Sequence, residues 1–364
     1  MRKLYFLGLA SKIRGAWRHI FARGKEADIA NIEKYLGQRY GGEAWAVKNG
    51  RTGLALALRA YFDKGDKVVV NGFTCHAVVE AVRAAGLTPV FADIDENLNF
   101  NARTLARVAD DGCVGIIVQN TMGNPVDIKA VERFAEKHGM LIVEDLAHSV
   151  GVRYADGREV GTVGVATALS FGKDKSVDTV SGGAVIFRET KRNRVTKPVA
   201  APGRCETWQA RWYPMFAAWS RGLTRIHLGG ALVRIFVKIR FVERSADNGL
   251  DMKCRIAPYQ AKLALPQLVA LEKPQGLLRE YMFVRDRAAA LAELKAAGYY
   301  FDALWYEKPV SPARYYDSVN FPEERCKCAV KIAEMIVNLP TYYPKAELAR
   351  AREILRKYKV EEVR

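Results

Sequence analysis

The runs MLIVED (140–145), ATALSF (166–171) and GAVIF (183–187) decide the fold class of this 364-residue chain, because each is short and almost wholly apolar. Three similar runs lie upstream: KVVVNG (67–72), TPVFADI (88–94) and VGIIVQ (114–119). Two stretches with a helical period lie among them, RTGLALALRAYF (51–62) and AVERFAEKHG (130–139). Strands of this kind that alternate with helices predict an α/β fold. Its mainly parallel sheet would be covered by helices on both faces.

Helical patterns return in the last third of the chain, around one further strand pattern. The helical stretches are PYQAKLALPQLVALEK (258–273), LLREYMFVRDRAAALAELKAAG (277–298) and AELARAREILRKY (346–358), and the strand pattern is MIVNLPTY (335–342). We therefore expect a large domain at residues 26–187 and a smaller C-terminal α/β domain at residues 248–364.

Two basic segments account for the whole net charge of +17. Residues 1–25 carry +7 and residues 188–244 carry +10, and both segments contain tryptophan. The helical period of residues 4–21 predicts a basic amphipathic helix within residues 1–25. Residues 188–247 are a basic, Trp-rich insertion, in which VRIFVKIRFV (233–242) alternates as a strand does, although a short helix stays open.

The basic segments leave two interpretations open, a solvated subunit interface or a surface that docks on an anionic membrane. Each basic residue near such a membrane contributes on the order of 1 kcal/mol. Nucleic acid is not expected as a partner, since no nucleic-acid motif is present. No apolar run suits a membrane span or a signal peptide. We expect a cytoplasmic protein, at the inner face of the cell membrane if the second interpretation holds.

The cysteines point to no metal site. The six cysteines are scattered, and the close pair Cys326 and Cys328 has no second pair or histidine with zinc-ligand spacing. Reduced thiols and the absence of a metal site are expected.

The ends of the predicted strands carry the groups of a chemical site. In such sheets ligands bind outside the carboxyl ends of the strands. Asp145 ends one strand and Ser170 ends another, and Lys173 and Lys175 follow Ser170. The segment Gly50-Arg51-Thr52 opens a helix, whose N–H groups can bind a phosphate. Pyridoxal phosphate (PLP) needs this set of groups: an amine for its aldehyde, donors for its phosphate and a carboxylate for its ring nitrogen. By themselves, Asp145 could equally cap a helix and the lysines could be surface charges.

The run from Gly139 to Phe187 resembles the core of the DegT/DnrJ/EryC1/StrS family, the fold-type-I, PLP-dependent sugar aminotransferases. Other segments fit the family in the same order and spacing. They are NGRTGLALAL, DKVVVNGFTCHAVVEAVRAAGLTPVFADID, the Gly-x-Pro-x-Asp of MGNPVDI, KCRIAPYQAKLALPQL and VNLPTYYP. The resemblance extends from about residue 27 to 360, apart from residues 188–247.

This resemblance implies a role for each matched residue. Lys175, not Lys173, would be the Schiff-base lysine and the catalytic residue. Asp145 would pair with the ring nitrogen, Ala147 would pack on the ring and His148 would hydrogen-bond the 3-oxygen of the cofactor. The phosphate would be held by Gly50, Arg51, Thr52 and Ser170. Lys253 stands where family members often send an Asn to the neighbouring subunit's phosphate, so the resemblance implies a homodimer with a shared active site.

Three positions depart from the family pattern. Cys75 stands where an aromatic residue usually stacks on the cofactor, so Cys75, or nearby His76 or Phe73, must serve there. Asn120 replaces a frequent His and Ser181 replaces a Glu. Sugar recognition is therefore the part of the resemblance that carries over least.

The resemblance implies an aminotransferase that moves an amino group from glutamate to a nucleotide-linked keto-sugar for surface glycan synthesis. A dehydratase-like PLP reaction on a sugar is one alternative, but that branch of the family has His in place of the lysine. The other alternative is a non-catalytic, membrane-associated scaffold with the same fold.

Overall fold

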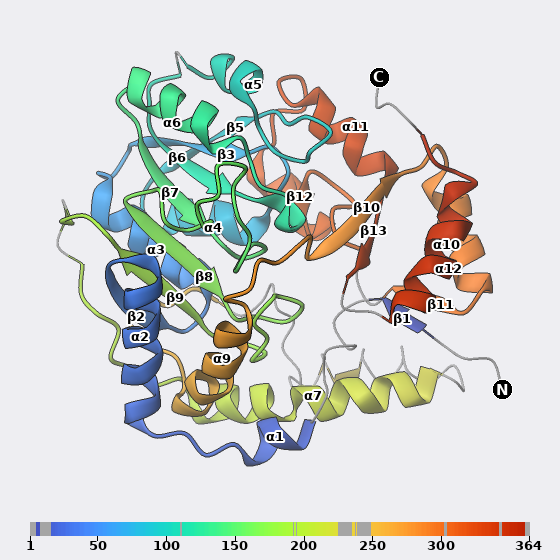
Figure 1. Cartoon of the computed structure of the whole chain (residues 1–364), viewed down its shortest axis with the longest axis horizontal. Coiled ribbons are helices and arrows are strands. Elements are labelled where there is room, and N and C mark those ends of the chain that lie inside the picture. Colours follow the sequence, from blue (N-terminus) through green and yellow to red (C-terminus); the bar gives the residue numbers. More distant parts are fainter. Residues whose placement is uncertain are drawn as a thin grey trace.

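The computed structural model describes residues 5–7, 16–109, 111–191, 193, 195–224, 235–236, 238, 249–301, 304–341 and 344–360. A large α/β body and a smaller unit lie side by side (Figure 1), and the helix α7 (Arg204–Thr224) runs beneath both. Most of the ambiguous run at residues 233–242 lies outside the described residues.

A seven-stranded sheet forms the centre of the large body. In spatial order its strands are β2 (Glu43–Val47), β9 (Gly183–Phe187), β8 (Ala166–Ser170), β7 (Leu141–Asp145), β6 (Cys113–Gln119), β3 (Lys67–Asn71) and β5 (Thr88–Ala92). The last five are parallel to one another, β9 is antiparallel to β8, and β2 is antiparallel to β9. All six strands predicted for this region are confirmed.

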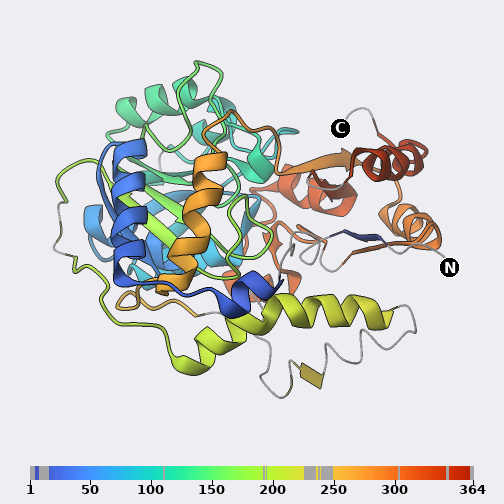
Figure 2. The same ribbon diagram turned by 60° about the horizontal axis from the view of Figure 1, so that its bottom comes forward.

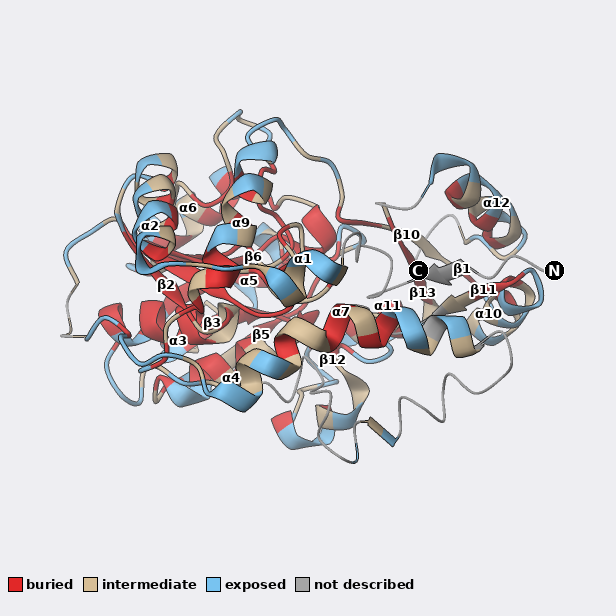
Figure 3. Cartoon of the chain, turned by 90° about the horizontal axis from the view of Figure 1, so that it is seen from below, coloured by how far each residue is buried: buried red, intermediate tan, exposed pale blue. Residues whose placement is uncertain are grey.

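Helices cover both faces of the sheet, as predicted. Because side chains alternate across a strand, Val68 and Val70 of β3 join one apolar core and Val69 joins the other. The first core contains α3 (Gly50–Tyr61), α4 (His76–Ala84) and α11 (Lys327–Met335). The second contains α2 (Glu26–Tyr40), α5 (Ala102–Ala106), α6 (Ile128–Lys137) and α9 (Pro258–Ala270). Helix α3 is the most enclosed, with nine buried residues (Figure 3).

The smaller unit has its own apolar core. Strands β10 (Arg279–Phe283) and β13 (Ile336–Pro340) pair antiparallel, and α10 (Arg287–Ala296) and α12 (Lys345–Arg356) pack beside them. The strand predicted at 335–342 is confirmed as β13. The helix predicted over 277–298 is wrong in its first turns, which form β10. The backbone ladder with β13 overrides the helical period there.

The N-terminal segment, residues 4–21, does not form the single helix that its period predicts. The predicted helix over residues 4–21 is wrong at β1 (Tyr5–Leu7), which pairs parallel with β11 (Tyr299–Phe301) of the smaller unit. Only α1 (Ala16–Phe21) is helical among the residues described here. An apolar run of three residues cannot distinguish strand from helix by its period, and β11 supplies the partner that selects a strand.

Helix α1 lies against α7 (Figure 2). Arg211 of α7 donates to the carbonyls of His19, Ile20 and Ala22 at the end of α1, at 3.1, 3.0 and 2.8 Å. A cation on the last carbonyls of a helix satisfies acceptors that have no partner within the helix. Within the described residues, no helix is long and apolar enough to cross a membrane.

The remaining short elements bring connecting loops to the sheet. Strand β4 (Thr74–Cys75) pairs parallel with β12 (Val310–Ser311), and the 3-10 turn η2 (Thr121–Gly123) follows β6. Two further 3-10 turns, η3 (Ala313–Tyr315) and η4 (Asp317–Val319), follow β12. Through β12, the C-terminal part of the chain reaches the segment that follows β3.

Candidate active site

The two lysines after β8 point to different parts of the molecule. The Lys173 amine lies 3.6 Å from the centre of the Tyr213 ring of α7. The Lys175 amine lies instead 4.9 Å from the centre of the Trp305 ring, inside the site. Burial lowers the pKa of Lys175, and the charge of Arg279 acts in the same direction, while Cys75, Asp145 and Asp174 oppose it. Of the two lysines, Lys175 is therefore the one whose amine lies in the site.

Asp145 is the acid of the site. It is buried at the end of β7, and its Oδ1 accepts a hydrogen bond of 2.9 Å from the Ala147 N–H. Burial raises the pKa of Asp145, although the Ala147 hydrogen bond and the charge of Lys175 lower it. Asp145 and Lys175 interact electrostatically, so the predicted acid and amine lie in one site.

Glu144, the neighbour of Asp145, is an acid of a different kind. It is fully buried and accepts hydrogen bonds from Gly161, Val163 and Gly164 N–H groups at 2.7, 2.7 and 2.8 Å. Successive residues of a strand face opposite sides of the sheet, so only one of the two carboxylates can face the site. Glu144 fastens the connection between β7 and β8, and Asp145 serves the site.

The His148 ring is oriented by a hydrogen bond to its Nδ1, which leaves Nε2 as the hydrogen-bond donor. Its Nδ1 accepts a hydrogen bond of 3.2 Å from the Met122 N–H of η2, so the neutral ring carries its proton on Nε2. Burial lowers the pKa of His148 well below 6.5, and Lys175 and Arg279 add to this. The ring also stacks on Trp305 at 4.9 Å between centroids.

The start of α3 and the end of β8 meet at close range. A Cβ on Gly50 would lie 2.6 Å from the Ser170 Cβ, and one on Gly183 would lie 2.7 Å from the Gly50 nitrogen. Only glycine fits at these positions. The Asn49 side chain accepts from the Thr52 N–H at 2.9 Å and caps the helix. The predicted phosphate residues Gly50, Thr52 and Ser170 therefore cluster at one helix N-terminus, where an anion is favoured.

Two residues of the predicted phosphate set face elsewhere with their side chains. The Arg51 guanidinium pairs with Glu80 of α4 at 2.5 Å, so Arg51 is left with its backbone N–H for an anion. Lys253 is exposed at the molecular surface. Its neighbour Asp251 donates its N–H to the Thr52 hydroxyl at 3.3 Å, so the segment runs along the start of α3.

The aromatic residues near Cys75 come from the C-terminal part of the chain. Cys75 is half-buried at the end of β4. Phe73 stacks on Tyr306 at 4.3 Å and His76 stacks on Tyr315 at 4.2 Å, so both predicted substitutes for the family's aromatic residue are engaged with other rings.

The sequence analysis missed three residues around Lys175, namely Arg279, Trp305 and Asn338. Arg279 begins β10, and its Nη1 donates to the Asn338 Oδ1 at 2.7 Å. Asn338 in turn donates to the Trp305 carbonyl at 2.9 Å. The VNLPTYYP segment was matched as a whole, but no role was assigned to its Asn338. Arg279 lay in a stretch predicted to be helical, which hid its position beside the site.

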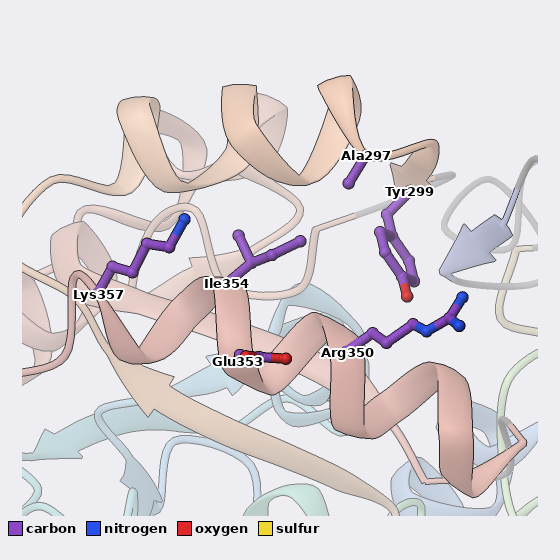
Figure 4. Close-up of a pocket in the computed structure, with 6 residues that line it drawn as sticks. All are labelled: Ala297, Tyr299, Arg350, Glu353, Ile354 and Lys357. Carbon is purple, nitrogen blue, oxygen red and sulfur yellow. The ribbon is translucent and has the colours of Figure 1, made fainter.

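The pocket in Figure 4 lies away from this cluster, between the end of α10, β11 and α12. It has a cavity volume of about 360 Å³ and is lined by Ala297, Tyr299, Arg350, Glu353, Ile354 and Lys357. None of the predicted site residues lines it. The candidate active site is therefore the Lys175 cluster.

The donor set around Lys175 fits PLP. It combines an amine of lowered pKa, a carboxylate at a strand end and a glycine cradle that a single Cβ would fill. Together with the sheet order, this set is what a fold-type-I, PLP-dependent enzyme needs.

The profile of the DegT/DnrJ/EryC1/StrS aminotransferase family matches residues 26–358, and the chain belongs to this family. A UDP-N-acetyl-3-dehydro-alpha-D-glucosamine 3-aminotransferase of Acidithiobacillus ferrooxidans is 27% identical over 92% of this chain and 88% of its own length. The spore coat polysaccharide biosynthesis protein SpsC of Bacillus subtilis is 33% identical, but the match spans 44% of this chain and 41% of the relative.

Solved structures share the fold over nearly the whole chain. S. venezuelae DesV has a TM-score of 0.70 at 20% identity and covers 98% of both chains. A DegT DnrJ EryC1 StrS aminotransferase of Brucella abortus has a TM-score of 0.66 at 21% identity, over 92% of this chain and 91% of its own. The predicted fold class and family are confirmed.

Proposed function

We propose that the chain is a PLP-dependent aminotransferase that transfers an amino group from glutamate to a nucleotide-linked keto-sugar. The single observation that carries this proposal is the shared buried site of Lys175 and Asp145 beside the Gly50–Ser170 cradle. The names of the relatives support the acceptor class. They include the Acidithiobacillus 3-aminotransferase and a GDP-perosamine synthase of Vibrio cholerae, which is 30% identical over 46% of this chain and 46% of its own length.

The residues of the large domain would hold the cofactor from two ends. The phosphate would bind at the start of α3 through the Gly50 and Arg51 backbone N–H groups and the hydroxyls of Thr52 and Ser170, since the Thr52 N–H is engaged by Asn49. Asp145 would pair with the ring nitrogen, because a cation placed against this carboxylate offsets the cost of burying its charge. When bound, PLP supplies an electron sink for the bond that breaks at the donor carbon.

The remaining residues orient the ring and move the proton. Ala147 would pack on the ring face, and His148 would donate from Nε2 to the 3-oxygen, since its Nδ1 is engaged with Met122. Lys175, whose lowered pKa favours the free amine, would take the proton from the donor Cα and return it on the other side of the transfer. Glutamate becomes 2-oxoglutarate, and the acceptor carbonyl becomes an amine.

A screen of 3-keto and 4-keto nucleotide sugars with glutamate tests this proposal. Mass spectrometry should detect an amino sugar and an equal amount of 2-oxoglutarate, and neither with Lys175→Ala. A product that has lost oxygen without gaining nitrogen would favour the dehydratase-like alternative. A purified protein that binds no PLP would favour the scaffold.

We also propose a homodimer in which each subunit completes the other's phosphate site through Lys253. The exposure of Lys253 and its position along the start of α3 support this arrangement. Light scattering should give a dimer. Lys253→Ala should weaken PLP binding, and mixing it with Lys175→Ala should restore activity in mixed dimers. A monomer, or no recovery after mixing, would contradict a shared site.

The third part of the proposal places the enzyme at an anionic membrane surface, through the patch formed by α1 and α7. Trp17 and Phe21 of α1 are 59% and 68% exposed, and Trp208 and Trp219 of α7 are 43% and 48% exposed. Tryptophan and basic residues together are typical of helices that lie in a membrane interface. Two copies of such a basic patch would repel each other, which favours an anionic partner over self-association.

Point variants test the patch better than a truncation, because a truncation would also remove β1 from its pairing with β11. Sedimentation with vesicles that contain phosphatidylserine should remove the wild-type protein from solution, and zwitterionic vesicles should not. The double variant Trp17→Ala/Phe21→Ala should lose this binding, whereas Val269→Ala, another exposed apolar residue on α9, should retain it. Equal binding of all three proteins would refute the membrane patch.

A further inference from the structure

Helix α7 of the basic insertion has two different faces. Ala210, Tyr213 and Ala217 recur at the spacing of one helix face, and all three are buried. The same period places Trp208 and Trp219 together on the opposite face, where both are exposed. The helix therefore stands between the outer patch that it forms with α1 and the body that contains the candidate site (Figure 1).

The inner face of α7 contacts the turn that carries Lys175. The Lys173 amine lies 3.6 Å from the centre of the buried Tyr213 ring. The Lys175 N–H donates to the Gly172 carbonyl at 3.3 Å, which closes a four-residue turn with Lys173 in it. Asp174 is in the left-handed region at φ 63°, as the third residue of a tight turn can be. Because such a turn fixes its residues together, the Tyr213 ring constrains the backbone from which Lys175 extends.

The same face of α7 contacts the segment that leads into the glycine cradle. Glu206 pairs with Lys48, at 3.1 Å between Oε1 and Nζ, and both side chains are mostly buried. Lys48 directly precedes Asn49, the N-cap of α3, and its carbonyl accepts from the Ser181 hydroxyl at 3.1 Å. Glu206 and Tyr213 lie two helical turns apart, about 10 Å along the axis. One face of one helix therefore contacts the segments at both ends of the proposed cofactor site.

We propose that α7 positions both ends of the cofactor site. Glu206 acts on the glycine cradle through Lys48. Tyr213 acts on the turn of Lys175 through Lys173. Both residues of α7 work through another side chain, so they are positioning residues and not catalytic ones. This inference rests on the proposed PLP-dependent function, because PLP is the group that the two ends would hold, but it does not rest on the membrane patch.

The outer patch is tied to the same two turns of α7. Arg211, which donates to the last carbonyls of α1, lies between Glu206 and Tyr213 in the helix. Helix α1 carries the exposed side chains of Trp17 and Phe21. A surface that binds the patch therefore restrains the part of α7 that holds the cofactor site. Binding at one place that rigidifies another lowers the entropic cost of a second binding event, so docking should tighten the hold on PLP.

The rate at which PLP leaves the loaded protein measures this positioning without turnover. Absorbance follows the release while an excess of a second, cofactor-free aminotransferase traps the free PLP. Tyr213→Leu should speed release about fivefold, because it removes the ring from the Lys173 amine, and Tyr213→Phe, which keeps a ring, should stay near wild type. Glu206→Gln should speed release about threefold.

Lys191→Met is the matched control for these changes. The Lys191 amine lies over the Trp45 and Phe187 rings, at 4.7 and 4.5 Å from their centres, so this variant loses a lysine–ring contact elsewhere in the large domain. It should leave the release of PLP unchanged. Unchanged release in both Tyr213→Leu and Glu206→Gln would overturn the proposal.

A double-mutant cycle separates positioning from a general loss of stability. If Tyr213 acts through Lys173, the double variant Lys173→Met/Tyr213→Leu should release PLP no faster than Lys173→Met alone. Effects that multiply would mean that Tyr213 only stabilises the fold, and would overturn its role. If Tyr213→Leu does not fold, the cycle of Glu206→Gln with Lys48→Met decides the question in the same way. In the apoprotein, hydrogen exchange of residues 172–178 should be faster in Tyr213→Leu and unchanged in Lys191→Met.

Phosphatidylserine vesicles test the link between the outer patch and the site. They should slow the release of PLP from the wild-type protein. Tyr213→Leu should still bind the vesicles but release PLP at one rate with and without them. Vesicle binding by the wild type without slower release would overturn the link.

The outcomes separate this inference from the proposals on which the patch and the cofactor depend. If the wild type binds no vesicles, the membrane proposal fails, and the cycle of Tyr213 with Lys173 still decides the role of α7. If the protein holds no PLP, the proposed function fails. Hydrogen exchange of residues 172–178 in the apoprotein then shows whether α7 holds the turn, and equal exchange in wild type and Tyr213→Leu would overturn that role as well.

Discussion

The two walls of the active site differ in the groups that they supply. The large domain supplies Lys175, Asp145 and the Gly50–Ser170 cradle, which lie at the ends of β7 and β8 and the start of α3. The smaller unit supplies Arg279 and Trp305, joined by Asn338. The first wall carries the groups that the proposed cofactor needs, and the second lies beside Lys175 and His148.

The largest expected effect comes from the first wall, in Lys175→Ala. Loss of the amine that moves the proton should reduce kcat by about 10⁴-fold, at the upper end of what one acid–base group contributes. Steady-state rates of product formation from glutamate and the keto-sugar measure this loss. Lys173→Ala serves as the control, because its amine lies on Tyr213 instead of in the site. A comparable loss in the control would mean that the wrong lysine has been chosen.

Asp145→Asn should have the next largest effect. An amide cannot keep the ring nitrogen protonated, so we expect kcat to fall about 10²–10³-fold, as when one electrostatic contact to a transition state is removed. The visible absorbance band of the bound cofactor should also change. Glu144→Gln should leave that band in place and instead lower stability, because Glu144 holds the β7–β8 connection and pairs with Arg188. The same change of band in both variants would remove the distinction between the two acids.

Asn338→Ala tests the second wall, where this side chain joins Arg279 and Trp305. It removes one hydrogen bond from Arg279 and one from Trp305, at a cost of about 1–3 kcal/mol in the free energy of unfolding. Because the guanidinium loses its anchor, KM for the substrates should rise while the affinity for PLP stays near that of wild type. As a control, Asn193→Ala breaks a partly buried hydrogen bond of 2.8 Å to the Phe62 carbonyl of the large domain. A rise in KM with that control as well would mean that lost stability alone explains the effect.

The smallest expected effect concerns the pH dependence of stability through His148. Its pKa in the folded protein lies well below 6.5, the ordinary value that it has in the unfolded chain. Between the folded and the unfolded pKa, the unfolded chain therefore binds more protons than the folded protein. Stability of the apoprotein should therefore fall as the pH drops below 6.5. Urea unfolding at about pH 7.5 and about pH 5 should show a smaller drop for His148→Gln than for wild type. An equal drop would place the responsible proton elsewhere.

The two walls also differ in how far the sequence predicted them. The strands of the large domain are short apolar runs with turns at both ends, and six of them were predicted correctly. Their ends place Asp145 and Ser170 at one edge of the sheet, but the choice of Lys175 over Lys173 and the role of each residue came from the family resemblance. Gly50 was predicted with them, and the structure adds Gly183, since helix and strand approach there within the width of one Cβ.

The second wall depends on long-range pairing that local patterns do not encode. Arg279 lies in a stretch with a helical period, and only its ladder with β13 turns that stretch into a strand. The same holds for β1, whose partner β11 lies almost 300 residues away along the chain. The side chain of Arg51 also depends on a tertiary partner, since Glu80 draws its guanidinium away from the cradle.

The identity of the lysine that bonds to the cofactor is the claim on which the whole account rests. Reduction of the PLP-loaded protein with borohydride fixes the cofactor on its lysine, and peptide mass spectrometry then locates it. We predict a pyridoxyl group on Lys175 and none on Lys173. A modification on Lys173, or no retained cofactor after reduction, would contradict the account.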